Sequence, residues 1–236
     1  MGLKDRWPTT TEEYNNYKVR FKNWGRWGRD DQLGTLNHIT PATVLHARGL
    51  IREGSTVSCA NPIATKDVVS DHHRNPRPAD HEMNVGPSSS GDYVGVAYHG
   101  FVNTHIDALC HIFTGAVDDG GRIYNDRDPA LITPHGALTN SIENWRDGIV
   151  TRGVLYDIPR LRGHDYVDPS QPVQGWDLQD WASKVGVEPR DGDAVLIRSG
   201  SDPFWAANPT FEFSFPPNTR YFLRYQLIAP WIHNHL

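Results

Sequence analysis

The string NTHIDALCH at residues 103–111 contains side chains that could bind a metal ion. His105 and Asp107 are two residues apart, so on an extended strand their side chains would point to the same side. An imidazole nitrogen and a carboxylate oxygen suit zinc or manganese, and a catalytic ion keeps open positions for water and substrate. If the chain turns after the strand, His111 can return to the same pocket, and His99 could add a third ligand.

The same residues are also compatible with a structural role. A histidine and an aspartate near each other can satisfy turn and backbone hydrogen bonds, and the spacing H-x-D-x-x-x-H alone gives this role about half the weight. His99, at the end of an expected strand, is at least as often a hydrogen-bonding residue as a ligand. Cys110 is expected to be a small buried hydrophobic residue and not a nucleophile, because water is the attacking group at a metal site.

A longer string favours metal binding. Residues 99–111, HGFVNTHIDALCH, resemble the signature H-x-G-T-H-x-D-x-P-x-H of the metal-dependent cyclase family, which includes kynurenine formamidase and isatin hydrolase. Asn103 stands where the signature has glycine and Leu109 where it has proline, and neither change removes a ligand. The strings WGRWGRDDQLGTLNHITP, GIVTRGVLYD and GDAVLIRSG are also similar to longer-armed members of the family, so the resemblance covers residues 24–200.

The resemblance implies a set of roles and a reaction. It implies His105 and Asp107 as ligands of Zn²⁺ or Mn²⁺, and His99 as a further ligand if a two-residue bulge is allowed. It implies His111 as the general acid/base. The implied reaction is hydrolysis of a small, flat, aromatic amide or lactam such as a formyl anilide or isatin, in which His111 passes a proton to the departing nitrogen.

The length of 236 residues favours one domain, residues 1–236. The order strand, helix, strand favours the α/β or mixed α+β class. The resemblance implies a central mixed, partly barrel-like sheet with flanking helices. Thr40 and Pro41 are expected to be the N-cap and first residue of a helix. The expected elements are an N-terminal arm at 1–40, helices at 41–52 and 176–184, strands at 56–63, 93–98 (buried), within 147–157 and at 193–198, a long loop at 64–90, and an atypical tail at 201–236.

Charge and hydropathy exclude several classes of protein. The chain has 23 basic and 28 acidic residues, a net charge of -5, and no basic stripe that would neutralise phosphates, so no nucleic-acid partner is expected. The sequence shows neither a signal-peptide core nor a run of about 18 apolar residues, which predicts a cytoplasmic protein without a membrane partner. Two cysteines are too few for a disulfide framework.

The tail departs from the family pattern. Family members continue with a segment that adds another histidine and an acidic residue to the metal site, and no such segment is recognisable at 201–236. Three functions are therefore open: the hydrolase, a cyclase or dehydratase of a secondary-metabolite pathway with the same metal site, and an altered or truncated, non-catalytic member. The expected partners are a small-molecule substrate and a second copy in a homodimer or higher homo-oligomer, which would cover an open sheet edge.

Overall fold

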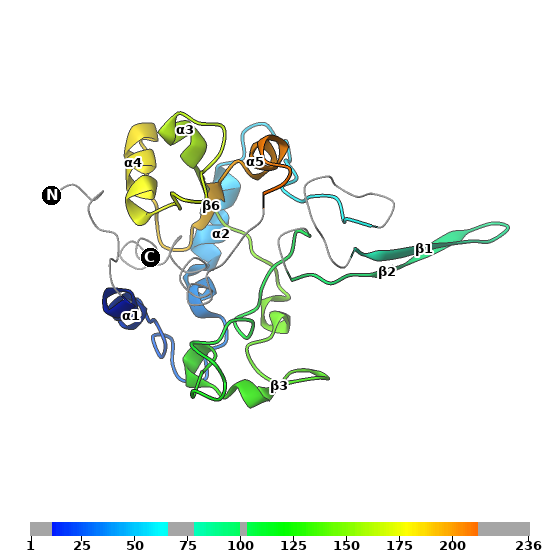
Figure 1. Ribbon diagram of the computed structural model, residues 1–236, viewed down its shortest axis with the longest axis horizontal. Coiled ribbons are helices and arrows are strands. Elements are labelled where there is room, and N and C mark those ends of the chain that lie inside the picture. Colours follow the sequence, from blue (N-terminus) through cyan, green and yellow to red (C-terminus); the bar gives the residue numbers. More distant parts are fainter. Residues whose placement is uncertain (1–10, 66–77, 100–102, 212–236) are drawn as a thin grey trace. The chain divides into compact units, whose positions relative to one another are not determined.

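The computed structural model describes residues 11–65, 78–99 and 103–211, which fall into two compact units (Figure 1). The described residues of the first unit are 11–52 and 107–204, and the second unit takes those of 53–106 together with 205–211. Helices and strands mix along the chain, so the predicted mixed α/β class is confirmed. Among the described residues the strands form three two-stranded sheets, one parallel and two antiparallel.

A parallel pair of strands forms the core of the first unit. β5 (Gly153–Asp157) and β6 (Ala194–Arg198) confirm the two strands predicted from their short apolar runs. The connection between parallel strands normally places helices against the sheet, because both faces need cover. α3 (Ile158–Arg162) and α4 (Gly175–Val185) lie in this connection and pack beside the strands (Figure 1). The buried cluster comprises Val154, Tyr156, Ile158, Val173, Leu178, Trp181 and Ala182.

α4 confirms the helix predicted at 176–184, and polar contacts hold it in place. The backbone N–H of Gln174 donates to Oδ2 of Asp177 (2.7 Å) and so caps the helix at its N-terminus. Arg162 donates to the same carboxylate oxygen (2.7 Å), which ties α3 to α4. The indole N–H of Trp181 donates to the carbonyl of Leu155 (2.8 Å) and holds α4 against β5.

α2 (Pro41–Gly49) confirms the helix predicted at 41–52, although it ends earlier. Thr40 is its N-cap: the N–H of Thr43 donates to Oγ1 of Thr40 (3.3 Å), and the N–H of Thr40 donates to Oγ1 of Thr43 (2.8 Å). This reciprocal pair satisfies amides that the helix itself leaves without acceptors. None of the helical residues is buried, and Leu45 is 62% exposed, so the apolar face read from the sequence is not covered by the described part of the chain.

The N-terminal arm contains α1 (Thr11–Arg20) and a 3-10 helix at Gly34–His38, joined by irregular chain. α1 was not predicted, because its sequence is polar and lacks an apolar period. The other short elements are 3-10 helices at Tyr124–Asp126, Pro129–Leu131 and Ile142–Trp145, the antiparallel strands β3 (Ile132–Thr133) and β4 (Gly136–Ala137), and α5 (Ser201–Ala207).

A polar clamp joins the arm to residues about one hundred positions later. The carboxylate of Asp31 accepts hydrogen bonds from the N–H of Gly34 (2.9 Å) and the hydroxyl of Tyr124 (2.8 Å). The side chain of Asn125 accepts from the N–H of Gly25 (2.7 Å) and donates to the carbonyl of Asp31 (3.0 Å). Asn125 adopts a left-handed backbone conformation (φ 61°), which short amide side chains tolerate better than most. Hydrogen bonds between polar groups therefore connect the arm to this later segment.

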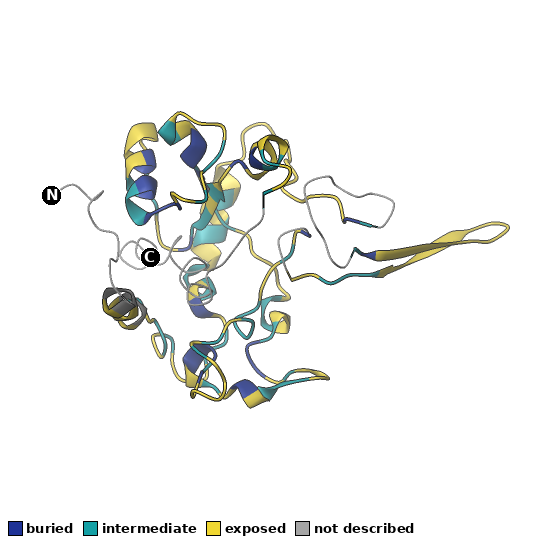
Figure 2. Cartoon of the chain, viewed as in Figure 1, coloured by how far each residue is buried: buried dark blue, intermediate teal, exposed yellow. Residues whose placement is uncertain are grey.

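The second unit contains an antiparallel hairpin made of β1 (Asp80–Val85) and β2 (Ser90–Gly95). The N–H of Gly86 donates to the carbonyl of Ser89 (2.8 Å) and closes the turn. Every residue of both strands is exposed except the half-buried Gly95, and the hairpin is accordingly yellow along its length in Figure 2.

Three predictions for this unit are wrong. Residues 56–63 form no strand, because their apolar residues find no partner strand among the described residues. The strand expected at 93–98 is exposed instead of buried, and it spans residues 90–95. The expected loop at 64–90 contains β1, whose alternating signal is limited to two apolar residues, Met83 and Val85. His72 and His73 lie outside the described residues.

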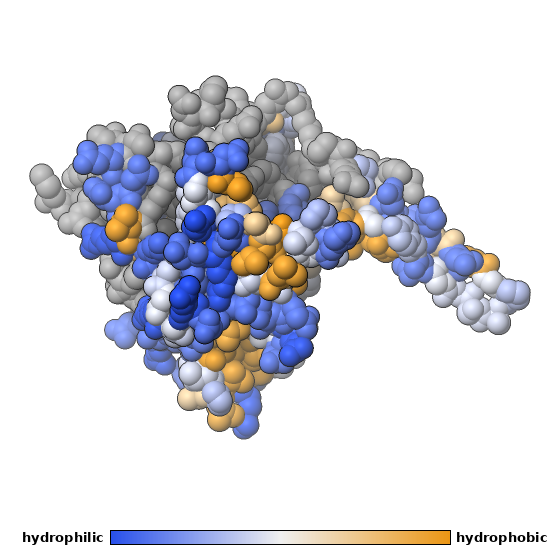
Figure 3. Space-filling view, turned by 90° about the horizontal axis from the view of Figure 1, so that it is seen from below, coloured by the Kyte–Doolittle hydropathy of each residue, from blue (hydrophilic) through white to orange (hydrophobic). Residues whose placement is uncertain are grey.

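Large apolar side chains reach the surface at several places in the described residues. Val57 is 86% exposed, Leu138 73% and Leu155 55%, and orange atoms are interspersed with blue ones in Figure 3. Within the described ranges, no helix combines the length and the apolar character needed to cross a membrane.

Candidate metal centre

Three of the candidate residues, His105, Asp107 and His111, lie on an irregular segment, residues 103–111, and not on a strand as their spacing suggested. The segment ends in a turn in which the N–H of His111 donates to the carbonyl of Ala108 (2.9 Å). The N–H of Cys110 donates to the carbonyl of Asn140 (3.1 Å), so the turn is fastened to the body of the first unit. The turn brings His111 back toward Asp107.

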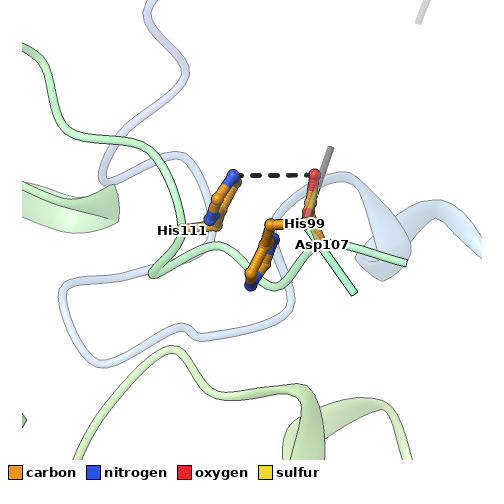
Figure 4. Close-up of side chains that lie close together, drawn as sticks. All are labelled: His99, Asp107 and His111. Atoms are coloured by element: carbon orange, nitrogen blue, oxygen red, sulfur yellow. Dashed lines mark ion pairs between the residues drawn. The ribbon is translucent and has the colours of Figure 1, made fainter. Parts of the chain in front are cut away.

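Asp107 and His111 approach each other within the first unit (Figure 4). Oδ2 of Asp107 lies 3.9 Å from Nε2 of His111, and the two side chains are 44% and 28% exposed. This distance is too long for a hydrogen bond, and two ligands of one tetrahedral zinc ion, at bond lengths of about 2.1 Å, lie roughly 3.4 Å apart. The pair could therefore form an ion pair when His111 is protonated, or share a cation after a small movement.

His99 and His105 belong to the second unit, where their rings meet edge to face with centroids 5.5 Å apart. Nδ1 of His105 is 2.8 Å from the carbonyl oxygen of Asn103. Because a carbonyl oxygen only accepts, Nδ1 carries a proton, and in the neutral imidazole the lone pair is then on Nε2. A backbone carbonyl that fixes the tautomer in this way is typical of histidines that bind metals through the other nitrogen.

Asn103, which differs from the glycine of the signature, has a structural role that the sequence did not indicate. It is 7% exposed, and its side chain accepts from the N–H of Ala64 (3.3 Å) and donates to the carbonyl of Ala97 (3.3 Å). Next to it, Oγ1 of Thr104 accepts from the N–H of Asn61 (2.8 Å). A glycine could not make the Asn103 bonds, so this chain anchors His105 by a side chain where the signature has none.

In the first unit, Asn140 supports the turn that carries His111. Asn140 is fully buried, its amide donates to the carbonyl of Tyr124 (2.9 Å), and its Oδ1 accepts from Arg127 (2.9 Å). Its own N–H donates to Oε1 of Gln32 (2.7 Å). Asn140 has a left-handed backbone (φ 54°). No local sequence signal identified it, because its partners are distant in the chain.

Burial and hydrogen bonds shift the pKa values of three residues near this turn: Asp31, Tyr124 and Cys110. Burial raises the pKa of the Asp31 carboxyl, but hydrogen bonds from Asn37, Gly34 and Tyr124 outweigh burial and leave that pKa below its ordinary value. Burial, the hydrogen bond to Asp31 and its charge raise the pKa of Tyr124. Burial also raises the pKa of the Cys110 thiol, so the thiolate needed for nucleophilic attack is disfavoured.

The sequence-predicted residues therefore form two described pairs, each in its own unit: His99 with His105, and Asp107 with His111. Each of the four supplies a nitrogen or oxygen atom of the kind that zinc and manganese bind.

The chain is similar to proteins described as cyclases. A family model with the description "Putative cyclase" matches residues 57–233, which is more than half of the chain. A solved structure described as "Crystal structure of a novel cyclase" is 28% identical, with a TM-score of 0.67, and the match covers 87% of this chain and 67% of that chain. No curated protein matches. The family match includes the candidate ligand segment and extends into residues 201–233. The expectation that the family resemblance ends at residue 200 is therefore wrong.

Proposed function

Since the chain belongs to the cyclase family, we propose that it is a metal-dependent hydrolase of a small amide or lactam. The ligands of a Zn²⁺ or Mn²⁺ ion would be His105 and Asp107, with His99 as a third. The observation that carries this proposal is the hydrogen bond between Nδ1 of His105 and the carbonyl of Asn103, because it leaves the lone pair on Nε2, the nitrogen that a metal would bind.

When bound, such an ion supplies Lewis acidity, which polarises a carbonyl group and makes water more acidic. A protein residue, His111, then transfers the proton. His111 accepts a proton from water as water adds to the carbonyl carbon, and it delivers that proton to the nitrogen as the C–N bond breaks. Asp107, whose Oδ2 lies 3.9 Å from Nε2 of His111, would stabilise the protonated form of the imidazole through its charge. The products are a carboxylic acid and an amine, or the ring-opened amino acid from a lactam.

The test is metal binding by purified protein, followed by a screen of amides. We expect near-stoichiometric zinc or manganese by elemental analysis and its loss in His105→Ala and Asp107→Ala. His111→Ala should retain the metal and lose turnover by about 10²-fold or more, since it moves a proton. His135→Ala is the matched control, because His135 is an exposed loop histidine outside the centre. A folded protein that binds neither metal would contradict the proposal and favour a non-catalytic member of the family.

The family description favours a second candidate, a cyclase or dehydratase that uses the same ligands. Both reactions need a polarised carbonyl, so metal binding does not separate them. The products do. A ring-opened acid or released formate supports hydrolysis, and a cyclised product from a linear precursor supports the alternative.

A further inference from the structure

Leu109 lies in the turn between Asp107 and His111, two residues from each. Its side chain packs against the arm at Gly34, where an added Cβ would lie 3.2 Å from Cδ1 and 3.7 Å from Cδ2 of Leu109. The same position is 3.8 Å from Cζ of Tyr124. The half-buried Leu109 therefore rests on a surface that Gly34 and Tyr124 form together. We name this surface the turn seat.

The lack of a side chain at Gly34 makes room for Leu109. A distance of 3.2 Å is shorter than the optimal separation of two carbon atoms, about 3.5–4.0 Å, so an alanine here would push Leu109 away. Gly34 also has a left-handed backbone (φ 59°), which glycine adopts without the steric cost that a Cβ brings. The close approach of Leu109 and the backbone conformation both favour glycine at this position.

Hydrogen bonds fix both parts of the turn seat. The carboxylate of Asp31 accepts from the N–H of Gly34 (2.9 Å) and from the hydroxyl of Tyr124 (2.8 Å). One side chain thus holds the glycine and the aromatic ring at a set distance from each other. Leu109 meets a surface whose shape is already fixed by polar contacts.

A second attachment joins the turn to the arm at the next residue. The N–H of Cys110 donates to the carbonyl of Asn140 (3.1 Å). The N–H of Asn140 in turn donates to Oε1 of Gln32, which lies two residues before Gly34 in the arm (2.7 Å). The turn is therefore held at consecutive residues, by a polar contact through Cys110 and by an apolar contact through Leu109.

We propose that Leu109 is a positioning residue, which holds Asp107 and His111 at the separation that the reaction needs. This inference rests on the proposed function. Oδ2 of Asp107 and Nε2 of His111 lie 3.9 Å apart, and both residues belong to irregular chain that no strand or helix orients. Their separation therefore depends on the conformation of the turn between them. The contact of Leu109 with the turn seat restricts that conformation.

Alkylation of Cys110 by iodoacetamide at constant pH, in metal-free protein, measures how firmly the turn is held. Cys110 is half-buried, whereas Cys59 is exposed and is replaced by serine in every protein compared. We expect Leu109→Ala to speed the alkylation of Cys110 about tenfold, because truncation of a packed leucine favours local opening. Leu109→Met fills a similar volume and should react at about the wild-type rate.

A matched control truncates a leucine elsewhere in the same unit. Leu161 is also half-buried and packs against the hydrophobic cluster beside the parallel strands. Leu161→Ala should leave the alkylation rate of Cys110 unchanged. Circular dichroism checks the fold of each protein, and Leu109→Val replaces Leu109→Ala if that variant does not fold.

Gly34→Ala separates the contact from backbone strain. In the wild-type background the new methyl group meets Leu109 and also strains the left-handed backbone, whereas in the Leu109→Ala background only the strain remains. We therefore expect the double variant to react more slowly than the product of the two single effects. In zinc titrations, Leu109→Ala should raise the Kd by about 10–100-fold and Leu109→Met should not.

Four results would overturn the inference. They are an alkylation rate that is the same in Leu109→Ala and wild type, an equal acceleration in Leu161→Ala, single effects that simply multiply in the double variant, and an unchanged zinc Kd in Leu109→Ala. A wild type that binds no zinc contradicts the proposed function instead. The alkylation rates, which need no metal, then still decide whether Leu109 holds the turn.

Discussion

Asp31 shows how one side chain can hold a long arm in place. Its carboxylate accepts hydrogen bonds from the arm and from Tyr124, and these lower its pKa below the ordinary value of 3.8. A carboxylate with a depressed pKa stabilises the folded state at pH values above its unfolded pKa, and this stability is lost as the pH falls through the folded pKa. Asp31 therefore contributes to stability at neutral pH and not in strong acid.

We expect Asp31→Asn to lower the free energy of unfolding at pH 7 by about 1–3 kcal/mol, because the hydrogen bonds to a charged acceptor are weakened. The deficit should shrink below about pH 4, where the wild-type carboxylate also becomes protonated. Urea unfolding at a series of pH values measures both effects. Asp118→Asn, in an exposed loop, is the control. A deficit that stays constant down to pH 2 would contradict this account.

Tyr156 gives the opposite pH dependence. It is fully buried, and burial and the charge of Asp193 raise its pKa to about 12. A raised pKa stabilises the fold below the unfolded value of about 10, and that contribution is lost as the pH rises through 12. We expect wild-type protein to lose stability between pH 10 and 12 and Tyr156→Phe to lose less, as measured by denaturant unfolding. Equal losses in the two proteins would show that Tyr156 does not titrate on unfolding.

At the scale of elements, α2 depends on its cap because its residues are not buried. Thr40→Ala removes the acceptor for the N–H of Thr43 and should cost about 1 kcal/mol of stability. Thr40→Ser keeps the oxygen and should cost only a few tenths of a kcal/mol of stability. Thermal unfolding followed by circular dichroism compares them. If both variants lose equal stability, the lost methyl group of threonine, and not the cap, is responsible.

The elements that could be predicted from the sequence are those whose signals are local. α2 follows from Thr40-Pro41, and β5 and β6 follow from short apolar runs. β1 was missed because only two of its residues, Met83 and Val85, are apolar. The strand at 56–63 was wrongly expected because apolar residues alone do not supply a partner strand. The candidate ligands were found by type and spacing. Asn103 and Asn140 were not, because their roles depend on contacts far away in the sequence.

At the scale of the whole molecule, metal binding should be measurable as stability. A ligand that binds only the folded state stabilises it in proportion to the logarithm of its concentration over its Kd, about 2.7 kcal/mol at one hundred times the Kd. We expect added zinc or manganese to raise the midpoint of thermal unfolding and a chelator to reverse the rise. His105→Ala should show neither change. A rise of the same size in His105→Ala would place the ion elsewhere, for instance at an adventitious surface site.

The first unit is discontinuous in sequence, and this has a consequence for how the protein is made. Asp31 and Gly25 cannot meet Tyr124 and Asn125 until nearly one hundred further residues have been added. At about 5–20 residues per second, ribosomes leave the arm without these partners for roughly 5–20 s. Residues 53–106 of the second unit are synthesised within that interval. The arm, with its tryptophans and cations, is therefore synthesised before the residues it binds. During this interval a chaperone that binds basic and aromatic segments would have access to it.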